Sequence, residues 1–468
     1  MTGEELLSLC RDALREAGEA EVLVCARHRA RGFARFAVGE LGQHMDLDDP
    51  VVTVRVAHGR KVAEGATALL EKSAIVQTIR DAAARARFVP ETEGFPGFTG
   101  ADEDGAPLEG SLPPRFAPST AGATADDRVE RLLPVLEAIR GAGLVSAGVL
   151  ETSATALAVA TTRGCARSHD STLATFKVWA LETPGAGGAA GYGGHMHRDV
   201  AALDLDGETA RAIRIAKMSR DPIALDAGSY DVVMEAPAVS ELLEWLGAIA
   251  FGASEVEQGT SPVAGRAGAL ITGEAITLHE DPLDPSDLGV AAPFDREGTW
   301  RRRVPLILRG VAREVLYDRT YAARMGARST GSAVFGDLGS AGGISASALS
   351  LEGGSAESVD ELIGGMDRGL YICRLHYVNG LLEPRRAVMT GLTRDGCFLV
   401  EKGKITRAVG NMRFTDSFLE ALARADGMTR MRQAIPTGWS DAGACVTPAV
   451  RMRQVRFNGK SQERPKLD

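Results

Sequence analysis

Residues 369–379 read Gly-Leu-Tyr-Ile-Cys-Arg-Leu-His-Tyr-Val-Asn, a run whose aliphatic and aromatic residues are typical of a buried strand. Alternate residues of a strand share a face. We therefore expect two faces, the first with Arg374, His376 and Val378 and the second with Cys373, Leu375, Tyr377 and Asn379. A rigid apolar strand with polar tips can form a cleft wall, so Arg374, His376 and Asn379 are the candidate substrate-cleft residues.

The surrounding sequence predicts more strands. Residues 387–393, 397–401 and 404–408 are short apolar runs, and Lys402–Gly403 fits the turn of a hairpin. Residues 237–253 have the apolar periodicity of a buried helix. Residues 226–468 are therefore predicted to form a mainly antiparallel β domain with a few helices.

The N-terminal half predicts an α/β unit. A helix over 4–17 is followed by strand-like runs at 21–26, 33–38 and 51–57 and by a second helix opened by Ser73, which gives an N-terminal α+β domain over 1–88. Residues 89–124 are rich in Pro, Gly and acidic residues, as expected of a linker. Residues 125–225 are predicted to be a central α+β segment, so the fold class is α+β.

The amino-acid composition favours some classes of protein and argues against others. The chain has 468 residues, of which 44% are hydrophobic and 25% charged, as in ordinary globular proteins. A net charge of −9 argues against a nucleic-acid partner. No signal peptide and no run of about 18 apolar residues is visible, so we expect a cytoplasmic protein without a membrane partner. Six cysteines scattered singly indicate reduced thiols.

The histidines do not form the helical zinc motif of a peptidase. That motif needs two His on one helical face and a neighbouring Glu that activates the metal-bound water. No two of the eight histidines lie four or five residues apart. His195 and His197 form the one close pair, and Asp199 is the next same-face position if this segment is a strand. A His195, His197 and Asp199 metal site is therefore an alternative to polar residues beside a glycine-rich loop.

Other chemistries have weaker support. The glycine-flanked serines near 332 and 345 lack the Gly-x-Ser-x-Gly elbow, and no phosphate-binding glycine loop is present. Cys445 has no neighbouring cation in the sequence that would lower the pKa of its thiol, so a buried thiol is expected.

The same C-terminal strands resemble the TldD/PmbA family. The resemblance is specific over about residues 190–430 and extends through a series of short segments. These are His197–Asp199, Gly259–Ser261, Gly265–Arg266, Asp281–Pro282, Pro293–Asp295, Glu297–Gly298, Gly310–Val311, Leu316–Asp318, 369–379, Met389–Phe398 and Asn411–Thr415.

In this family the TldD-type subunit carries His-Glu-x-x-x-His on a helix, plus a distal Cys, to hold zinc. The helix in the matching place here has Glu244, Trp245, Leu246, Gly247, Ala248 and Ile249 instead. The resemblance therefore implies a TldE (PmbA)-type subunit without a cofactor of its own. It further implies a heterodimer with a zinc-bearing TldD-like partner that cuts short or unfolded peptides, including precursor peptides of modified natural products.

Two other functions stay open from the sequence. The first is an independently active enzyme with another site on the family scaffold, such as His195, His197 and Asp199. The second is a peptide-binding protein in which an edge strand of the C-terminal sheet receives an extended peptide.

Overall fold

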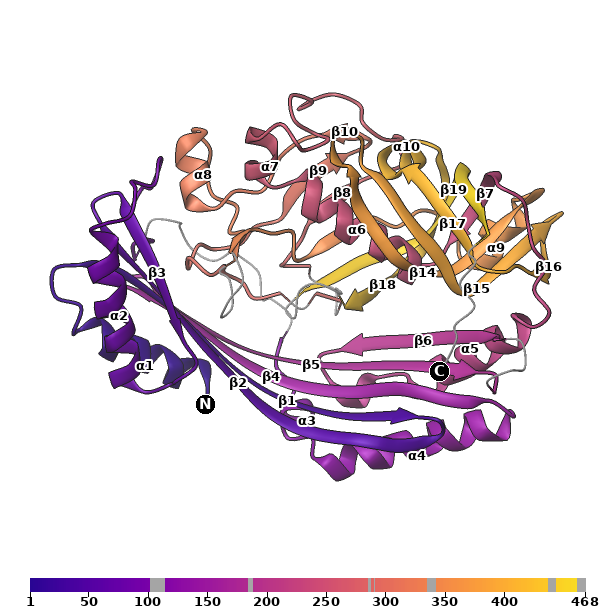
Figure 1. Cartoon of the computed structure of the whole chain (residues 1–468), viewed down its shortest axis with the longest axis horizontal. Coiled ribbons are helices and arrows are strands. Elements are labelled where there is room, and N and C mark those ends of the chain that lie inside the picture. The colour runs from indigo at the N-terminus through magenta and orange to yellow at the C-terminus, as the bar shows by residue number, and fades with distance from the viewer. Residues whose placement is uncertain are drawn as a thin grey trace.

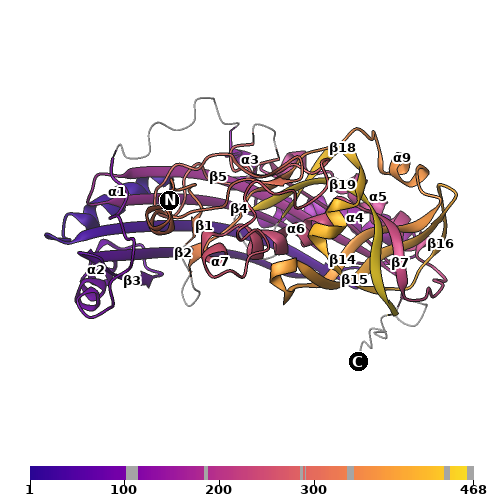
Figure 2. The ribbon, with the colours of Figure 1, turned by 90° about the horizontal axis from the view of Figure 1, so that it is seen from above.

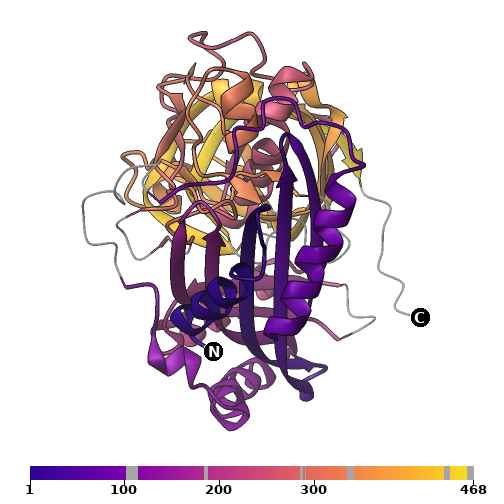
Figure 3. The same cartoon turned by 90° about the vertical axis from the view of Figure 1, so that its left-hand side faces the viewer.

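The computed structural model describes residues 1–101, 114–183, 188–284, 288–289, 291–334, 342–436 and 443–460. Two bodies are stacked in it. A long curved sheet with helices on its outer side forms the lower body, and a second, barrel-like body sits above the concave face of that sheet (Figure 1). The view from the end shows the same stacking (Figure 3).

The lower sheet has six antiparallel strands in the order β3-β2-β1-β4-β5-β6. Their bounds are β1 Glu21–Ala37, β2 Glu40–His58, β3 Lys61–Thr67, β4 Val145–Thr161, β5 Ala166–Leu181 and β6 Ala190–His197. Because β1 pairs with both β2 and β4, the segments 1–88 and 125–225 are parts of one sheet. The segment 89–124, of which 102–113 lie outside the described residues, connects two parts of that sheet.

Helices cover the convex face of this sheet. They are α1 Gly3–Leu14, α2 Lys72–Ala86, α3 Pro118–Ala121, α4 Ala125–Gly141 and α5 Leu205–Met218, with a 3-10 turn at Val200–Ala202. The even-numbered residues of β1 point toward these helices. Val22 and Val24 pack against α1 and α2 at one end of the strand, and Phe36 packs against α4 at the other end. Odd-numbered residues point to the concave face, where Leu23 and Cys25 pack against Phe294 of the upper body.

The upper body is an 11-stranded sheet that closes on itself. Pairings run β7–β14–β15–β17–β19 and return from β19 to β7, so five strands form a closed circuit. These five are β7 Gly228–Met234, β14 Arg368–Glu383, β15 Val388–Glu401, β17 Met412–Ser417 and β19 Ala444–Lys460. A closed circuit leaves these strands with few exposed edges.

The remaining elements extend that circuit. The strands are β8 Leu278–Glu280, β9 Val304–Leu308, β10 Val311–Ala312, β13 Leu349–Leu351, β16 Lys404–Ala408 and β18 Ala425–Pro436, with a separate pair β11 Ala333–Val334 and β12 Gly343–Ile344. The helices are α6 Ala236–Ala250, α7 Ala253–Glu257, α8 Arg319–Arg324, α9 Val359–Gly364 and α10 Phe418–Ala423, with a 3-10 turn at Pro384–Arg386.

Helix α6 is the apolar centre of the upper body. Leu242, Leu243 and Leu246 are buried among side chains of β7, β14 and β19. Burying each such side chain stabilises the fold by roughly 1.5–3 kcal/mol relative to exposure. The helix is therefore fixed in position by its buried side, which also fixes the direction of its remaining side.

Most of the predicted C-terminal elements are confirmed. The mixed fold class is correct, and the predicted helix 237–253 corresponds to α6. The predicted hairpin turns at Lys402–Gly403, with φ of +50° and +72°. The apolar run at 268–278 also predicts a strand, but this prediction is wrong, because Gly268 has φ of +79° and β8 begins only at Leu278.

Two expectations from the sequence concern membrane-spanning segments and the state of the cysteines. Among the described residues, no helix has the length and apolar character that crossing a membrane requires. All six cysteine side chains are buried thiols. Burial raises the pKa of the Cys445 thiol well above its ordinary value, as do the nearby carboxylates Glu244 and Glu280.

The Arg128 guanidinium lies directly over Gly32 of β1. It donates to Thr152 Oγ1 at 2.9 Å and to the carboxylate of Asp46, and a Cβ on Gly32 would lie 2.3 Å from one of its nitrogens. We therefore expect Gly32→Ala to lower the free energy of unfolding by about 1–3 kcal/mol in denaturant titrations. Gly42→Ala on β2 is the matched control, because its Cβ would meet nothing within 4 Å. Equal stability of the two variants would contradict this account.

Candidate functional site

Helix α6 presents one partly exposed stripe. Glu241, Glu244, Trp245 and Ala248 are the α6 residues after Ser240 that are not buried. Their spacing of three and four residues places them on one helical face. Because the opposite face fills the core of the upper body, this stripe points out of that core.

The concave face of the lower sheet lies opposite this stripe. In the strand register, Lys177 of β5 pairs with Val149 of β4 and Gly194 of β6, and Trp179 pairs with Tyr192. Lys177 and Trp179 are two residues apart, so both side chains share a face. The rings of Trp179 and Tyr192 lie 5.0 Å apart between centroids. These side chains lie where the sheet meets the upper body, and this region between the two bodies is termed the cleft.

Arg374 of β14 connects the two bodies at this cleft. Its Nη1 lies 2.7 Å from Oδ2 of Asp395 on β15, and that oxygen also accepts a hydrogen bond of 3.0 Å from Trp179 Nε1. The guanidinium lies 4.8 Å from the centroid of the Tyr192 ring, within cation–π range. Its Nε is 3.9 Å from Glu241 Oε1. One arginine thus joins both strands, the helix stripe and the cleft floor.

Two titratable groups of the cleft are strongly perturbed. Burial raises the pKa of Glu241 to about 7, and Glu244 and Asp395 add to the rise while Arg374 opposes it. Burial lowers the pKa of Lys177, and the positive charge of Arg374 lowers it further. Within the described part of the chain, the Lys177 side chain has no hydrogen bond or ion pair. A half-buried amine and a carboxyl that titrates near neutrality are typical of functional sites.

This arrangement can bind polar groups of a ligand. Lys177 has three donors that can reach carbonyl or carboxylate oxygens, and the carboxylates of α6 can accept from amide or ammonium groups. Across the residues that the structure covers, no three His, Cys, Asp or Glu side chains are grouped so that they could hold a metal ion. The side chains of the described cleft thus offer binding and proton exchange.

The three residues predicted to line a substrate cleft, Arg374, His376 and Asn379, lie in different surroundings. Arg374 lies in the cleft, as described above. The His376 ring is 4.2 Å from that of Tyr377, centroid to centroid, and Asn379 Oδ1 accepts a local hydrogen bond of 2.8 Å from Leu381 N. The alternation expected along this strand was wrong at two irregularities. The register shifts between Ile372 and Arg374, so Cys373 packs in a different cluster from Leu375, with which it was expected to share a face. Tyr377 has φ of +51°, and Val378 joins Leu375 in the core instead of sharing a face with His376.

The alternative metal-site residues lie on the other side of the sheet. His195 and His197 of β6 pair with Phe176 and Ala174 of β5, which face the helices of the convex side. Nδ1 of His195 accepts from Asp204 N at 3.0 Å, and Nδ1 of His197 accepts from Asp199 N at 3.0 Å. The Asp199 carboxylate accepts from Ser119 Oγ at 2.6 Å. These groups hold the loop after β6.

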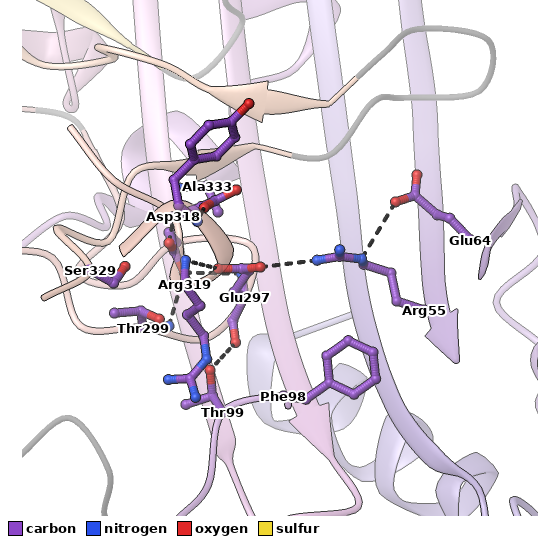
Figure 4. A network of polar contacts seen from close by, with 12 residues as sticks. Arg55, Glu64, Phe98, Thr99, Glu297, Thr299, Asp318, Arg319, Ser329 and Ala333 are labelled. Atoms are coloured by element: carbon purple, nitrogen blue, oxygen red, sulfur yellow. Dashed lines mark hydrogen bonds and ion pairs between the residues drawn. The ribbon is translucent and has the colours of Figure 1, made fainter. Parts of the chain in front are cut away.

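A second polar contact joins the two bodies at the other end of the sheet (Figure 4). Glu297 Oε1 accepts from Arg55 Nη1 of β2 at 3.0 Å, and its backbone oxygen accepts from Thr99 Oγ1 at 2.7 Å. Burial and the charge of Glu297 raise the pKa of Asp295 to about 7 and that of Asp318 to about 6. Both carboxylates accept backbone N–H groups, so this network fastens the loops of the upper body onto the sheet.

Several cleft residues were not predicted from the sequence. Lys177, Trp179 and Glu241 are single polar or aromatic residues in ordinary strand and helix patterns, and no local signal marks them. Asp395 had a signal, because Asp-Gly inside a strand pattern indicates a bulge. The structure has this bulge, with φ of +51° at Asp395 and +124° at Gly396.

Comparison with known proteins agrees with this architecture. A family model described as the PmbA/TldA metallopeptidase C-terminal domain matches residues 227–459. A metalloprotease of Methanothermobacter thermautotrophicus is 25% identical over 260 residues, which cover 53% of this chain and 54% of that protein. An uncharacterized protein of Methanocaldococcus jannaschii is 33% identical over 133 residues, which cover 28% of this chain and 31% of that protein. The matches thus span about half or less of these relatives.

The fold of the whole chain also has a solved counterpart. TldE from Thermococcus kodakarensis superimposes with a TM-score of 0.86 at 19% identity, covering 97% of this chain and 99% of that chain. Residues 227–459 are thus similar to the C-terminal domain of the PmbA/TldA metallopeptidases. The fold of the complete chain is that of TldE.

The raised pKa of Glu241 predicts a pH dependence of stability. The folded chain holds this proton up to about pH 7, above the ordinary value of 4.5, so folding becomes less favourable as pH rises between the two values. Glu241→Gln should remove this loss. Relative to wild type, the free energy of unfolding of the variant should rise by up to about 1.4 kcal/mol per pH unit between the two pKa values. Denaturant titrations at pH 5 and pH 8 measure the gain.

Glu274→Gln is the control, because the Glu274 side chain is 76% exposed. A stability difference between Glu241→Gln and wild type that stays constant with pH would contradict the assignment.

Proposed function

We propose that this chain is a non-catalytic, TldE-like subunit of a heterodimeric zinc metallopeptidase that degrades or processes short or unfolded peptides. Its partner is a TldD-like chain with the His-Glu-x-x-x-His motif, which supplies the zinc. The observation that carries the proposal is the cleft-facing stripe of α6, which has Glu241, Glu244, Trp245 and Ala248 where a zinc helix needs two histidines.

The sequence supports the absence of a helical zinc site in this chain. A zinc helix places two His one turn apart, and no pair of histidines in this sequence has that spacing. A subunit without metal can still bind and orient the substrate and exclude water from the reacting bond. We thus assign substrate binding to this chain and peptide-bond hydrolysis to its partner.

The cleft supplies groups that suit a peptide backbone. We assign substrate contacts to Lys177, Arg374, His376 and Asn379, and among the described residues the Lys177 ammonium has no hydrogen-bond or ion-pair partner that a ligand would have to displace. A peptide carbonyl or carboxylate is the matching acceptor. Precursor peptides of modified natural products belong to the proposed substrate class, and the proposed location is the cytoplasm.

Activity should require both chains. We expect no digestion of unstructured peptides by either chain alone and digestion by the co-expressed pair, measured by mass spectrometry of the products. Replacing the motif Glu of the partner with Gln should stop digestion while leaving assembly intact, because that Glu activates the zinc-bound water. Chelator-sensitive cleavage by this chain alone would overturn the proposal.

The zinc content of the pair should come from the partner. We expect elemental analysis to give about one zinc per pair and none for this chain purified alone. The double variant His195→Ala/His197→Ala should leave the zinc content of the pair unchanged. Loss of zinc in that variant would instead favour an independent site on this chain.

Lys177 should contribute to substrate binding. We expect Lys177→Met to raise the KM of the pair for peptides about ten-fold with little change in kcat, as for a lost hydrogen bond to a charged group of about 1.4 kcal/mol. Lys217→Met on α5 is the matched control, since Lys217 is an exposed lysine on the convex side. An equal KM for the two variants would remove Lys177 from the site.

A further inference from the structure

Two hydrogen-bond donors lie side by side where the sheet borders the cleft. Lys177 of β5 pairs with Gly194 of β6, and Tyr192 shares the face of Gly194 because the two are two residues apart. A Cβ on Gly194 would lie 2.3 Å from Tyr192 Oη, so the tyrosine hydroxyl takes the place of the side chain that Gly194 lacks. Paired residues of neighbouring strands have Cβ positions about 4.5–5.5 Å apart. The Tyr192 hydroxyl therefore lies beside Lys177.

Neither donor has an acceptor within the described part of the chain. Neither the Lys177 ammonium nor the Tyr192 hydroxyl makes a hydrogen bond there. Tyr192 is 8% exposed and Lys177 is half-buried. Burial raises the pKa of the Tyr192 hydroxyl to about 12, so this group keeps its proton at neutral pH. Buried polar groups usually have a partner, so the two donors, termed the donor pair, are ready to bind an acceptor.

The donor pair lies between the two bodies. Strands β14 and β15 of the upper body lie over the half of the lower sheet that is remote from α1 and α2 (Figure 2), and β15 contacts β6. Arg374 of β14 stands over the Tyr192 ring, 4.8 Å from its centroid. Electrostatic interactions are stronger in such a partly desolvated place than in open water.

The charges around the donor pair favour an anion. Arg374, Glu151 and Glu244 are the charged groups that face Lys177. Within the described chain, Lys177 forms an ion pair with neither carboxylate, and Glu151 instead lies 3.6 Å from Arg31 Nε. Arg374 adds a second positive charge near the ammonium. A negatively charged acceptor is therefore the matching ligand.

We propose that the donor pair binds the C-terminal carboxylate of the substrate peptide, so that this chain selects peptides with a free C-terminus. One carboxylate oxygen accepts from the Lys177 ammonium and the other from the Tyr192 hydroxyl. The inference rests on the proposed function, because it takes a peptide as the ligand of the cleft, and it names the part of the peptide that the cleft recognises.

A terminal carboxylate fits better than the other acceptors of a peptide. A backbone carbonyl lacks the charge, and hydrogen bonds between charged groups are roughly twice as strong as neutral ones. An Asp or Glu side chain adds rotatable bonds, whose ordering costs entropy. A C-terminal residue also carries an amide N–H close to its carboxylate, and Glu244 of α6, which faces Lys177, can accept it.

Matched peptides separate these acceptors. One peptide without Asp or Glu is made with a free C-terminus and as the C-terminal amide, and a third is the amide with one internal Glu. Each carries a fluorophore at its N-terminus, and anisotropy during titration with the full chain gives Kd. We expect the free acid to bind about ten-fold more tightly than either amide. The net charge of −9 repels carboxylates, so a general attraction cannot produce this preference.

Variants of the two donors should remove the preference. Lys177→Met should weaken binding of the free acid about ten-fold and leave the amide unchanged, whereas Lys177→Arg should keep the preference. Tyr192→Phe keeps the ring beside Trp179 and should weaken binding of the acid about three-fold. Lys217→Met is the control and should retain the wild-type preference. Circular dichroism and the unfolding midpoint verify that all variants are folded.

Three results overturn the inference: equal Kd values of acid and amide for the wild type, a preference that survives Lys177→Met, or an internal Glu that binds as tightly as a free C-terminus. Each of them leaves digestion by the pair, and so the proposed function, untouched. Conversely, a ten-fold preference of the full chain together with a pair that digests nothing would contradict the proposed function alone.

Discussion

The pairing of β1 with β4 is the constraint on which the rest of this structure depends. Leu23–Ala37 pairs residue by residue with Ala147–Thr161, across more than a hundred residues of intervening chain. This ladder turns two separate stretches of sequence into a single sheet. A sheet of such long strands twists and curves, and its concave face receives the upper body. Two of the polar contacts between the bodies, the Arg374 cluster and the Glu297 network, lie at the two ends of this face.

The two faces of the sheet have different chemistry because strand residues alternate. Residues that face the helices are small or aliphatic, as Val22, Val24 and Ala26 are, and they form the structural side. Residues on the face toward the upper body include Arg27, Arg29, Lys177 and Trp179, of which Lys177 and Trp179 form the cleft floor. Desolvation in the cleft raises the pKa of Glu241 and lowers that of Lys177. Such groups are costly to the fold, which is a reason to expect that they serve ligand binding.

The two sides of α6 meet different constraints. Its buried side fills the core of the upper body, whereas the stripe of Glu241, Glu244, Trp245 and Ala248 is partly exposed. Because function resides in side chains placed on a fold, residues of such a stripe can differ between proteins of one fold while the core stays the same.

The sequence by itself predicted most of the C-terminal elements and a resemblance to the TldD/PmbA family. Apolar periodicity located α6, the Lys402–Gly403 turn located the β15–β16 hairpin, and motif order from His197 to Thr415 indicated the family. Only the tertiary structure determined that residues 1–88 and 125–225 share a sheet, because strand pairing across a linker leaves no local pattern. It also determined which side chains meet between the two bodies, since Lys177, Glu241 and Arg374 come from three distant elements. Two irregularities of β14, between Ile372 and Arg374 and at Tyr377, break the alternation on which the sequence-based prediction of its faces depends.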